Sequence, residues 1–210
     1  MFVLCYYLAS TAIVLPMEFE LHENLDAQVK NFLNKHRDNW RDLNISVDEG
    51  KALYDLILKN NYTRALEIGT STGHSGIWIA WALSKTGGEL VTIEISQHRC
   101  DQALEYFEET GLSEYIDIRL GDAHAIVPQL EGPFEFIFCD ADKVWYKNYL
   151  VATLPKLTDN GCFTAHNVLD QGMAGISEFL EYLASLPYLD TTIDDSSKSG
   201  ISISYKRSEK

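Results

Sequence analysis

The sequence predicts a single α/β domain with a doubly wound, mostly parallel seven-stranded sheet and helices on both of its faces. Two observations support this fold class. Short β-rich runs alternate with helical segments along most of the chain, which is typical of sheets whose strands are joined by crossover helices. The length of 210 residues, with a hydrophobic fraction of 46%, suits one good core and argues against two domains.

The first segment, residues 1–16, is almost entirely apolar and carries no charge. It is too short to span a membrane comfortably, so we expect no stable membrane span. It also lacks the positive region that begins a signal peptide. Three interpretations stay open: an upstream extension with Met17 as the natural start, a degenerate export signal, and an ordered apolar arm that docks on the body or on a partner.

Residues 17–60 are predicted to form two helices that cover the mouth of the site. The first is expected from Glu18 to Trp40, because apolar residues recur there on one helical face. The second is expected from about Val47 to Lys59. Ser46, with Glu49 three residues later, is a capping-box signature for the start of that second helix.

The remaining residues, 61–210, contain the most informative stretch of the chain, at residues 63–75. An apolar run ends at Glu67, turns through Gly69 and Gly73, and opens into an apolar stretch with helical spacing. Glycines let a ligand lie against bare backbone, and the start of a helix offers N–H groups to an anion. The Gly-x-x-x-Gly spacing differs from the dinucleotide fingerprint and is typical of the first motif of S-adenosylmethionine (SAM) methyltransferases.

A second acidic residue, Glu94, ends the next apolar run, residues 90–95. This is about where a ribose-binding carboxylate is expected, at the end of the second strand of such a unit. The glycine loop and Glu94 together predict a nucleotide-like ligand.

After Glu94 the chain alternates regularly between helices and strands. We expect helices near 97–110, 123–130, 146–157 and 176–186, strands at 116–120, 133–139 and 161–165, and closing β-rich runs near 189–194 and 200–205. In this fold, ligands bind at the carboxyl ends of the strands.

Polar residues that could carry chemistry follow the predicted strands. They are Glu67, Glu94, Asp122, Asp140 and the pair His166-Asn167. The tetrapeptide Asp140-Ala-Asp-Lys143 places a carboxylate and a lysine at one strand terminus, where they can hold a cation and keep an amine beside it. The alternative is a helix-capping aspartate next to a surface lysine.

Several segments resemble the cation-dependent O-methyltransferases related to catechol and caffeoyl-coenzyme A O-methyltransferases. The matching segments are residues 43–45, 67–73, 94, 140–149 and 167–169, and the most specific of them reads Asp-Ala-Asp-Lys-x-x-Tyr-x-x-Tyr. The resemblance covers roughly residues 40 to 205. It implies a Rossmann-like methyltransferase fold, SAM as cofactor, a small aromatic, catechol-like acceptor whose hydroxyl receives the methyl group, and a possible homodimer.

The same resemblance implies site residues. Cofactor contacts are implied at Asn44, Ile45, Glu67, Gly69, Ser71, Gly73, Ser75, Glu94, Asp122, Ala123 and Asp140. A divalent cation is implied at Asp140, at the residue before Asn167 and at Asn167 itself, with Lys143 as base. The chain departs from the family at the second of these ligands, because His166 stands where the family has aspartate. A nitrogen ligand favours Mn²⁺, Zn²⁺ or Fe²⁺ over Mg²⁺.

Three interpretations of His166 follow: a metal ligand in a retuned site, a general base in a metal-free site, or a strand-end histidine that only forms hydrogen bonds. Three alternatives to the metal-assisted enzyme correspondingly stay open. These are a metal-independent SAM methyltransferase that uses His166 or Lys143 as base, a non-catalytic SAM-binding protein, and a dehydrogenase, which the loop spacing disfavours.

The overall charge argues against a nucleic-acid partner. The chain has 17 basic and 31 acidic residues, a net charge of -14, so its surface repels phosphate backbones. The four cysteines, Cys5, Cys100, Cys139 and Cys162, show no paired short spacing and fit a reducing compartment. We therefore expect a cytoplasmic protein, with export through the N-terminal segment as the alternative.

Overall fold

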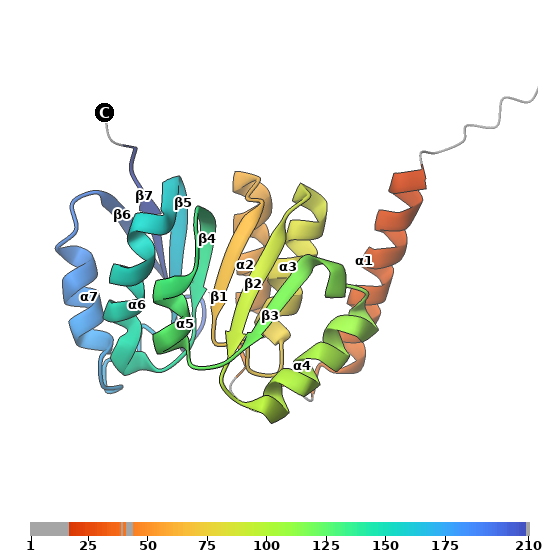
Figure 1. The fold of residues 1–210 in the computed structure, drawn as a ribbon, viewed down its shortest axis with the longest axis horizontal. Helices are drawn as coiled ribbons and strands as arrows, with labels where there is room; N and C mark the ends of the chain where they lie inside the picture. The colour runs from red at the N-terminus through yellow and green to blue at the C-terminus, as the bar shows by residue number, and fades with distance from the viewer. Residues whose placement is uncertain (1–16, 39, 41–43, 209–210) are drawn as a thin grey trace, which may run out of the picture.

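The computed structural model describes residues 17–38, 40 and 44–208 (Figure 1). The three interpretations of residues 1–16 concern residues outside this described part. A seven-stranded sheet with the order β3-β2-β1-β4-β5-β7-β6 forms the centre of the molecule. Its strands are β1 Arg64–Ile68, β2 Glu89–Glu94, β3 Ile116–Leu120, β4 Phe134–Cys139, β5 Leu157–His166, β6 Leu189–Asp194 and β7 Ile201–Lys206. The first five run parallel, and β7 pairs antiparallel with β5 and β6, so the predicted fold class is confirmed.

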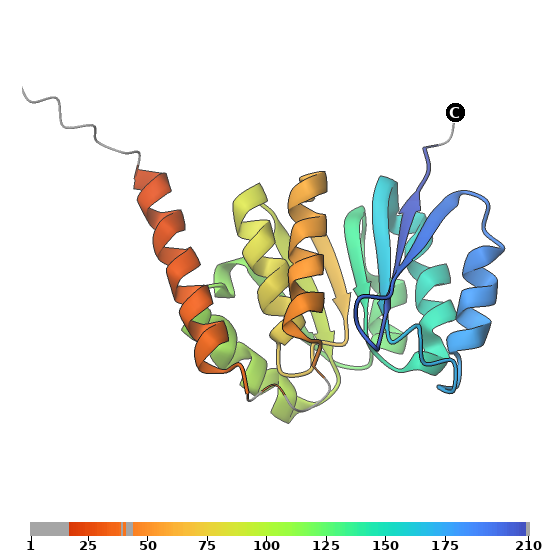
Figure 2. The ribbon, with the colours of Figure 1, turned by 180° about the vertical axis from the view of Figure 1, so that it is seen from behind.

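Helices cover both faces of the sheet. They are α1 Met17–Lys35, α2 Val47–Asn60, α3 His74–Thr86, α4 Gln97–Thr110, α5 Ala123–Gln129, α6 Tyr146–Thr153 and α7 Ile176–Ala184. Figures 1 and 2 show α5, α6 and α7 on one face and α2 and α3 on the other. Alternate strand residues feed two separate cores: Ala65 and Phe136 pack with α2 and α3, whereas Leu66 and Ile137 pack with α6 and α7.

The helix α1 lies against α3 and α4 at the side of the molecule (Figure 2). Lys35 pairs with Glu109 of α4 at 2.6 Å, and the indole N–H of Trp81 in α3 donates to Asp26 at 2.7 Å. No helix in the described residues has both the length and the apolar character needed to cross a membrane.

Two helices end several residues earlier than the sequence predicts. α1 stops at Lys35 and not at Trp40, whose indole stacks on the ring of His74 with 4.3 Å between centroids. α6 stops at Thr153, and a short 3₁₀ turn that contains proline follows it. Leu157, expected in that helix, begins β5 instead and pairs with Phe134 of β4. Proline ends the helix because it has no N–H to donate.

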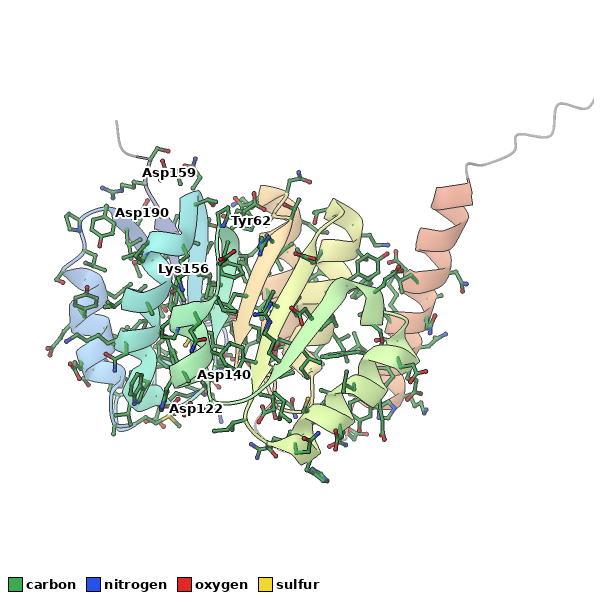
Figure 3. All side chains as sticks on the ribbon, in the orientation of Figure 1. Tyr62, Asp122, Asp140, Lys156, Asp159 and Asp190 are labelled. Carbon is green, nitrogen blue, oxygen red and sulfur yellow. The ribbon has the colours of Figure 1, made fainter. Side chains whose placement is uncertain are left out.

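The carboxyl ends of the parallel strands meet at one edge of the sheet. The strand order reverses between β1 and β4, which are neighbours there, and such a switch point is where this fold binds ligands. The N–H of Asp140 donates to the carbonyl of Ile68 at 2.9 Å across this point. Figure 3 shows Asp122 and Asp140 together at this edge, with Tyr62 and Asp159 at the opposite one.

Candidate active site

The glycine loop between β1 and α3 lies directly against the end of β4. Gly69 has a φ of +99°, and a Cβ there would lie 2.7 Å from the carbonyl oxygen of Asp140. Only glycine allows this close approach without displacing backbone. Ser71, at the turn of the loop, also takes a left-handed conformation with a φ of +49°. The loop is therefore held in one shape against the strand that carries Asp140.

Glu94, at the end of β2, forms a hydrogen bond with this loop. Its Oε2 accepts the backbone N–H of Ser71 at 2.8 Å, and its Oε1 accepts the N–H of Ser96 at 2.8 Å. The side chain is buried. The structure thus brings together the glycine loop and the carboxylate that the sequence singled out, although the loop follows β1 and the carboxylate ends β2.

The segment before α2 closes over the same loop. The amide of Asn44 donates to the hydroxyl of Thr72 at 3.0 Å, and the carbonyl of Ile45 lies 2.9 Å from Nδ1 of His74. Nε2 of His74 accepts the indole N–H of Trp78 at 3.1 Å, so the ring proton is on Nδ1 and is donated to Ile45. Burial lowers the pKa of His74 to about 4, opposed by the hydrogen bond to Ile45.

Glu67 lies beneath the loop and is completely buried. Its Oε2 accepts the hydroxyl of Thr92 at 2.5 Å, and Ser75 also forms a side-chain hydrogen bond with it. Burial raises the pKa of Glu67 to about 8, although both hydroxyls act in the opposite direction. Two residues expected to contact a cofactor, Glu67 and Ser75, therefore contact each other under the loop backbone.

The reaction centre predicted at the ends of β4 and β5 is assembled as a row of charged groups. Nζ of Lys143 lies 2.6 Å from Oδ1 of Asp140, and Nδ1 of His166 lies 3.1 Å from Oδ2 of the same carboxylate. The hydroxyl of Tyr146 donates to the carbonyl of His166 at 3.2 Å from beneath. All three predicted catalytic side chains are thus brought together.

Glu49 is a member of this row that the sequence interpretation assigned only to helix capping. Its Oε1 lies 2.9 Å from Nε2 of His166 and accepts the hydroxyl of Ser197 at 2.6 Å. The predicted capping box is also present, because Oε2 accepts the N–H of Ser46 at 2.7 Å. No local sequence signal points to the contact with His166, since a capping-box glutamate is ordinarily exposed.

Electrostatics supports a charged pair at this point. Burial alone would raise the pKa of Glu49, but hydrogen bonds from His166 and Ser197 outweigh it and lower that pKa to about 2. Burial alone would lower the pKa of His166, but hydrogen bonds to Asp140 and Glu49 raise it to about 9. Both shifts favour a carboxylate facing an imidazolium.

The side chains implied as ligands of a divalent cation are Asp140, His166 and Asn167. Both ring nitrogens of His166 face carboxylates, and each oxygen of Asp140 already has a partner. Asn167 follows in a left-handed conformation with a φ of +61°. Within the described residues, no group of three or more histidine, cysteine, aspartate or glutamate side chains is arranged to hold a metal ion. This donor set does not fit the expected cation.

Two of the implied cofactor contacts, Asp122 and Ala123, lie at the start of α5. Asp122 is the N-cap of this helix and accepts the N–H of His124 at 2.9 Å, and Ala123 is the first helical residue. The ring of His124 stacks on Trp145 with 3.8 Å between centroids, and its Nε2 lies 3.1 Å from Asp142. A polar and aromatic wall therefore borders the site here, and the sequence interpretation did not assign its member His124.

The three aromatic residues after Lys143 point in different directions. Tyr146 and Tyr149 are buried, and the hydroxyl of Tyr149 donates to Asp142 at 2.7 Å. Trp145 is 38% exposed, so it is the one of the three that faces solvent at the rim of the site.

Comparison with protein families gives a match over most of the chain. A family model described as O-methyltransferase matches residues 17–179. The chain is 36% identical over 134 residues to catechol O-methyltransferase of Niastella koreensis, which covers 62% of this chain and 60% of that protein. It is 33% identical over 138 residues to caffeoyl-CoA O-methyltransferase 1 of Eucalyptus globulus, covering 63% and 56%. The match therefore spans somewhat more than half the length of these relatives.

Solved structures share the fold over nearly the whole chain. An O-methyltransferase from Bacillus cereus in complex with SAH has a TM-score of 0.73 at 26% identity, covering 93% of this chain and 94% of that one. An SAH-bound methyltransferase of Podospora anserina has a TM-score of 0.76 at 21% identity, covering 94% and 100%. The second likeness bears on the fold alone.

Proposed function

We propose, from the premise that the chain belongs to the O-methyltransferase family, that it transfers a methyl group from SAM to a hydroxyl of a small aromatic acceptor. In this reaction the bond between sulfur and the methyl carbon breaks, a bond between that carbon and the acceptor oxygen forms, and the hydroxyl proton leaves. The site therefore has to bind SAM, place an aromatic hydroxyl in line with the methyl group and handle one proton.

The observation that carries the cofactor proposal is the hydrogen bond from the glycine loop to Glu94. One oxygen of this carboxylate bonds the glycine loop at Ser71 and the other bonds Ser96 at the start of α4, so the carboxylate is fixed at the ligand edge of the sheet, where it can accept the two hydroxyls of a ribose. The first N–H groups of α3, which starts at His74, suit the carboxylate of the methionine part. The SAH-bound relative from Bacillus cereus supports the same ligand class.

Exposed apolar side chains beside the reaction centre support an aromatic acceptor. Val144 is 61% exposed, and Leu169 and Met173, on the loop after β5, are about as open as Trp145. Gly175 brings that loop against the backbone of Lys143, since a Cβ there would lie 2.4 Å from the carbonyl of Lys143. The names of the relatives, catechol and caffeoyl-CoA O-methyltransferase, point to acceptors of the same kind.

Lys143 is the residue that we assign to the acceptor proton. A proton acceptor needs a free lone pair, and His166 has none while both its nitrogens donate to carboxylates. The amine of Lys143 bonds Asp140 and the carbonyl of Ala141 at 3.0 Å, which leaves its third position for the acceptor oxygen, and in the neutral amine this position carries the lone pair that takes the proton. A phenol of pKa about 10 and a lysine of pKa about 10.4 exchange a proton almost evenly.

The test is methyl transfer from labelled SAM to a panel of phenols and catechols, with SAM affinity measured separately by calorimetry. We expect SAM binding and transfer to at least one aromatic hydroxyl. Tight SAM binding without transfer to any acceptor would instead identify a SAM-binding protein. NADH binding without SAM binding would overturn the cofactor proposal itself.

A further inference from the structure

We infer that the reaction centre works without a divalent cation, because His166, held by Glu49 on one side and Asp140 on the other, takes the position that a cation would need. This inference rests on the proposed methyl transfer, and it names the class of acceptor that such a site can use.

Each ring nitrogen of His166 faces a group that can only accept a proton. Nδ1 lies 3.1 Å from Asp140, and Nε2 lies 2.9 Å from Glu49. An ionised carboxylate has no proton to donate, so both nitrogens act as donors. A ring that donates from both nitrogens carries a positive charge and keeps no lone pair for a metal ion. The ring is also shielded, with its side chain only 6% exposed.

Neither carboxylate is free to turn toward a metal ion. Glu49 is fixed by the hydroxyl of Ser197 and by the backbone N–H of Ser46, so three separate segments meet at its two oxygens. The second oxygen of Asp140 is taken by Lys143 at 2.6 Å. Ligation would therefore require several buried hydrogen bonds to break together.

The charges in the row are already balanced. The two carboxylates, Glu49 and Asp140, face the imidazolium of His166 and the amine of Lys143, which is cationic until it gives up its proton to act as base. Adding a divalent cation would leave two excess positive charges in a site that is largely closed to water. An uncompensated charge in such surroundings is costly. The imidazolium of His166 supplies positive charge where a metal ion otherwise would.

This arrangement predicts which acceptors react. A metal ion acts by binding two neighbouring oxygens and lowering the pKa of the hydroxyl that attacks. Without it, a single hydroxyl is sufficient, and the acceptor has to lose its proton to Lys143 with no metal ion to lower its pKa. At pH 7 a phenol of pKa about 10 is only about 0.1% ionised, whereas one of pKa about 7 is half ionised. Acidic monophenols are therefore the favoured class.

The first test measures Mn²⁺ binding to the full chain by electron paramagnetic resonance, with and without SAM. We expect no saturable binding below millimolar Mn²⁺. We also expect EDTA to change methyl transfer less than twofold, and a monophenol to react within about threefold of a catechol of equal pKa. Micromolar Mn²⁺ binding, or a tenfold loss of transfer in EDTA, would overturn the inference.

Variants separate the role of the histidine from general charge effects. His166→Asp places a carboxylate beside Asp140 and Asn167, and it should bind Mn²⁺ at least tenfold more tightly than the natural chain. His98→Asp makes the same substitution at an exposed position of α4 and should bind no Mn²⁺. Retained SAM affinity shows that each variant is folded. Equal Mn²⁺ affinity of the natural chain and His166→Asp would contradict the inference.

The two proposals fail in different ways. If no acceptor is methylated although SAM binds, the proposed function is wrong, and the Mn²⁺ titration still decides whether the row of charged groups accepts a cation. If transfer occurs only with added metal, the proposed function stands and the present inference is wrong.

Discussion

The carboxylate of Glu49 lies 2.9 Å from Nε2 of His166, across 117 positions of sequence, and this contact joins the start of α2 to the end of β5. It makes an N-terminal helix part of the proposed reaction centre. Each of the two side chains is at most 6% exposed, so the two charged groups interact with each other and not with water.

Removing this contact should destabilise the protein strongly. Glu49→Ala leaves His166 with a single carboxylate and an unpaired buried N–H, a situation that typically costs about 3–5 kcal/mol of unfolding free energy. Urea denaturation at pH 7 measures this. Asp48→Ala, at an exposed neighbouring position of the same helix turn, serves as the control and should cost under about 1 kcal/mol. Equal costs for the two variants would exclude a stabilising pair between Glu49 and His166.

Glu94→Ala should weaken SAM binding. The charge-assisted hydrogen bonds to the ribose would be lost together with the hold on Ser71, and such a loss costs about 1–3 kcal/mol of binding free energy. Calorimetric titration of both proteins with SAM gives the difference. Glu89→Ala, at the exposed start of the same strand, should leave the affinity unchanged. If Glu94→Ala binds SAM as tightly as the natural chain, Glu94 does not contact the cofactor.

Lys143→Met should slow methyl transfer without weakening SAM binding. Loss of a positioned proton acceptor typically reduces the rate by about 10²–10⁴. Single-turnover kinetics at saturating SAM isolates this step. Lys147→Met removes a more exposed lysine that pairs with Glu178 at 2.8 Å, and its rate should match that of the natural chain. A similar rate for both variants would remove Lys143 from the reaction.

His74 should make the protein sensitive to mild acid. Its folded pKa of about 4 lies below the ordinary value of 6.5, so between these values the unfolded chain binds a proton that the folded chain does not. Stability is therefore complete above about pH 6.5 and falls as the pH drops toward 4, by about 3 kcal/mol in all.

The measurement for His74 is the unfolding free energy in urea at several pH values from 7 to 4. His74→Gln lacks the titrating ring, so its stability should fall less steeply over this interval. His98→Gln replaces an exposed histidine and should retain the slope of the natural chain. Identical slopes for all three proteins would show that His74 is not held neutral by its contacts with Ile45 and Trp78.

Gly69→Ala should be more damaging than a glycine substitution elsewhere. The added Cβ would lie 2.7 Å from the carbonyl of Asp140, in a backbone conformation that already disfavours side chains. Gly87→Ala is the matched control, because its φ of +72° is also left-handed but nothing lies within 4 Å. Thermal unfolding should show a loss of about 1–3 kcal/mol for strain alone in Gly87→Ala and a larger loss in Gly69→Ala. Equal losses would mean that the loop can move away from β4.

Much of the fold could be predicted because strand and helix periodicity are local properties. The run that ends at Glu67, the glycine loop and the run that ends at Glu94 each carry their pattern within a few residues, and the structure forms β1, α3 and β2 there. The residues at which helices and strands begin and end were harder to predict from the sequence. Leu157 continues a helical pattern in the sequence, but its pairing with Phe134 makes it a strand residue.

The sequence by itself determined which chemical groups gather at the ligand edge, because residues that follow parallel strands share one edge of the sheet. Asp140, Lys143 and His166 meet there as expected. Only the tertiary structure decided what state these groups take. Glu49 reaches His166 through the packing of α2, and the two carboxylates that face the ring then favour a paired imidazolium over a metal ligand. Charge state depends on neighbours and solvent, which are set by contacts between residues far apart in the chain.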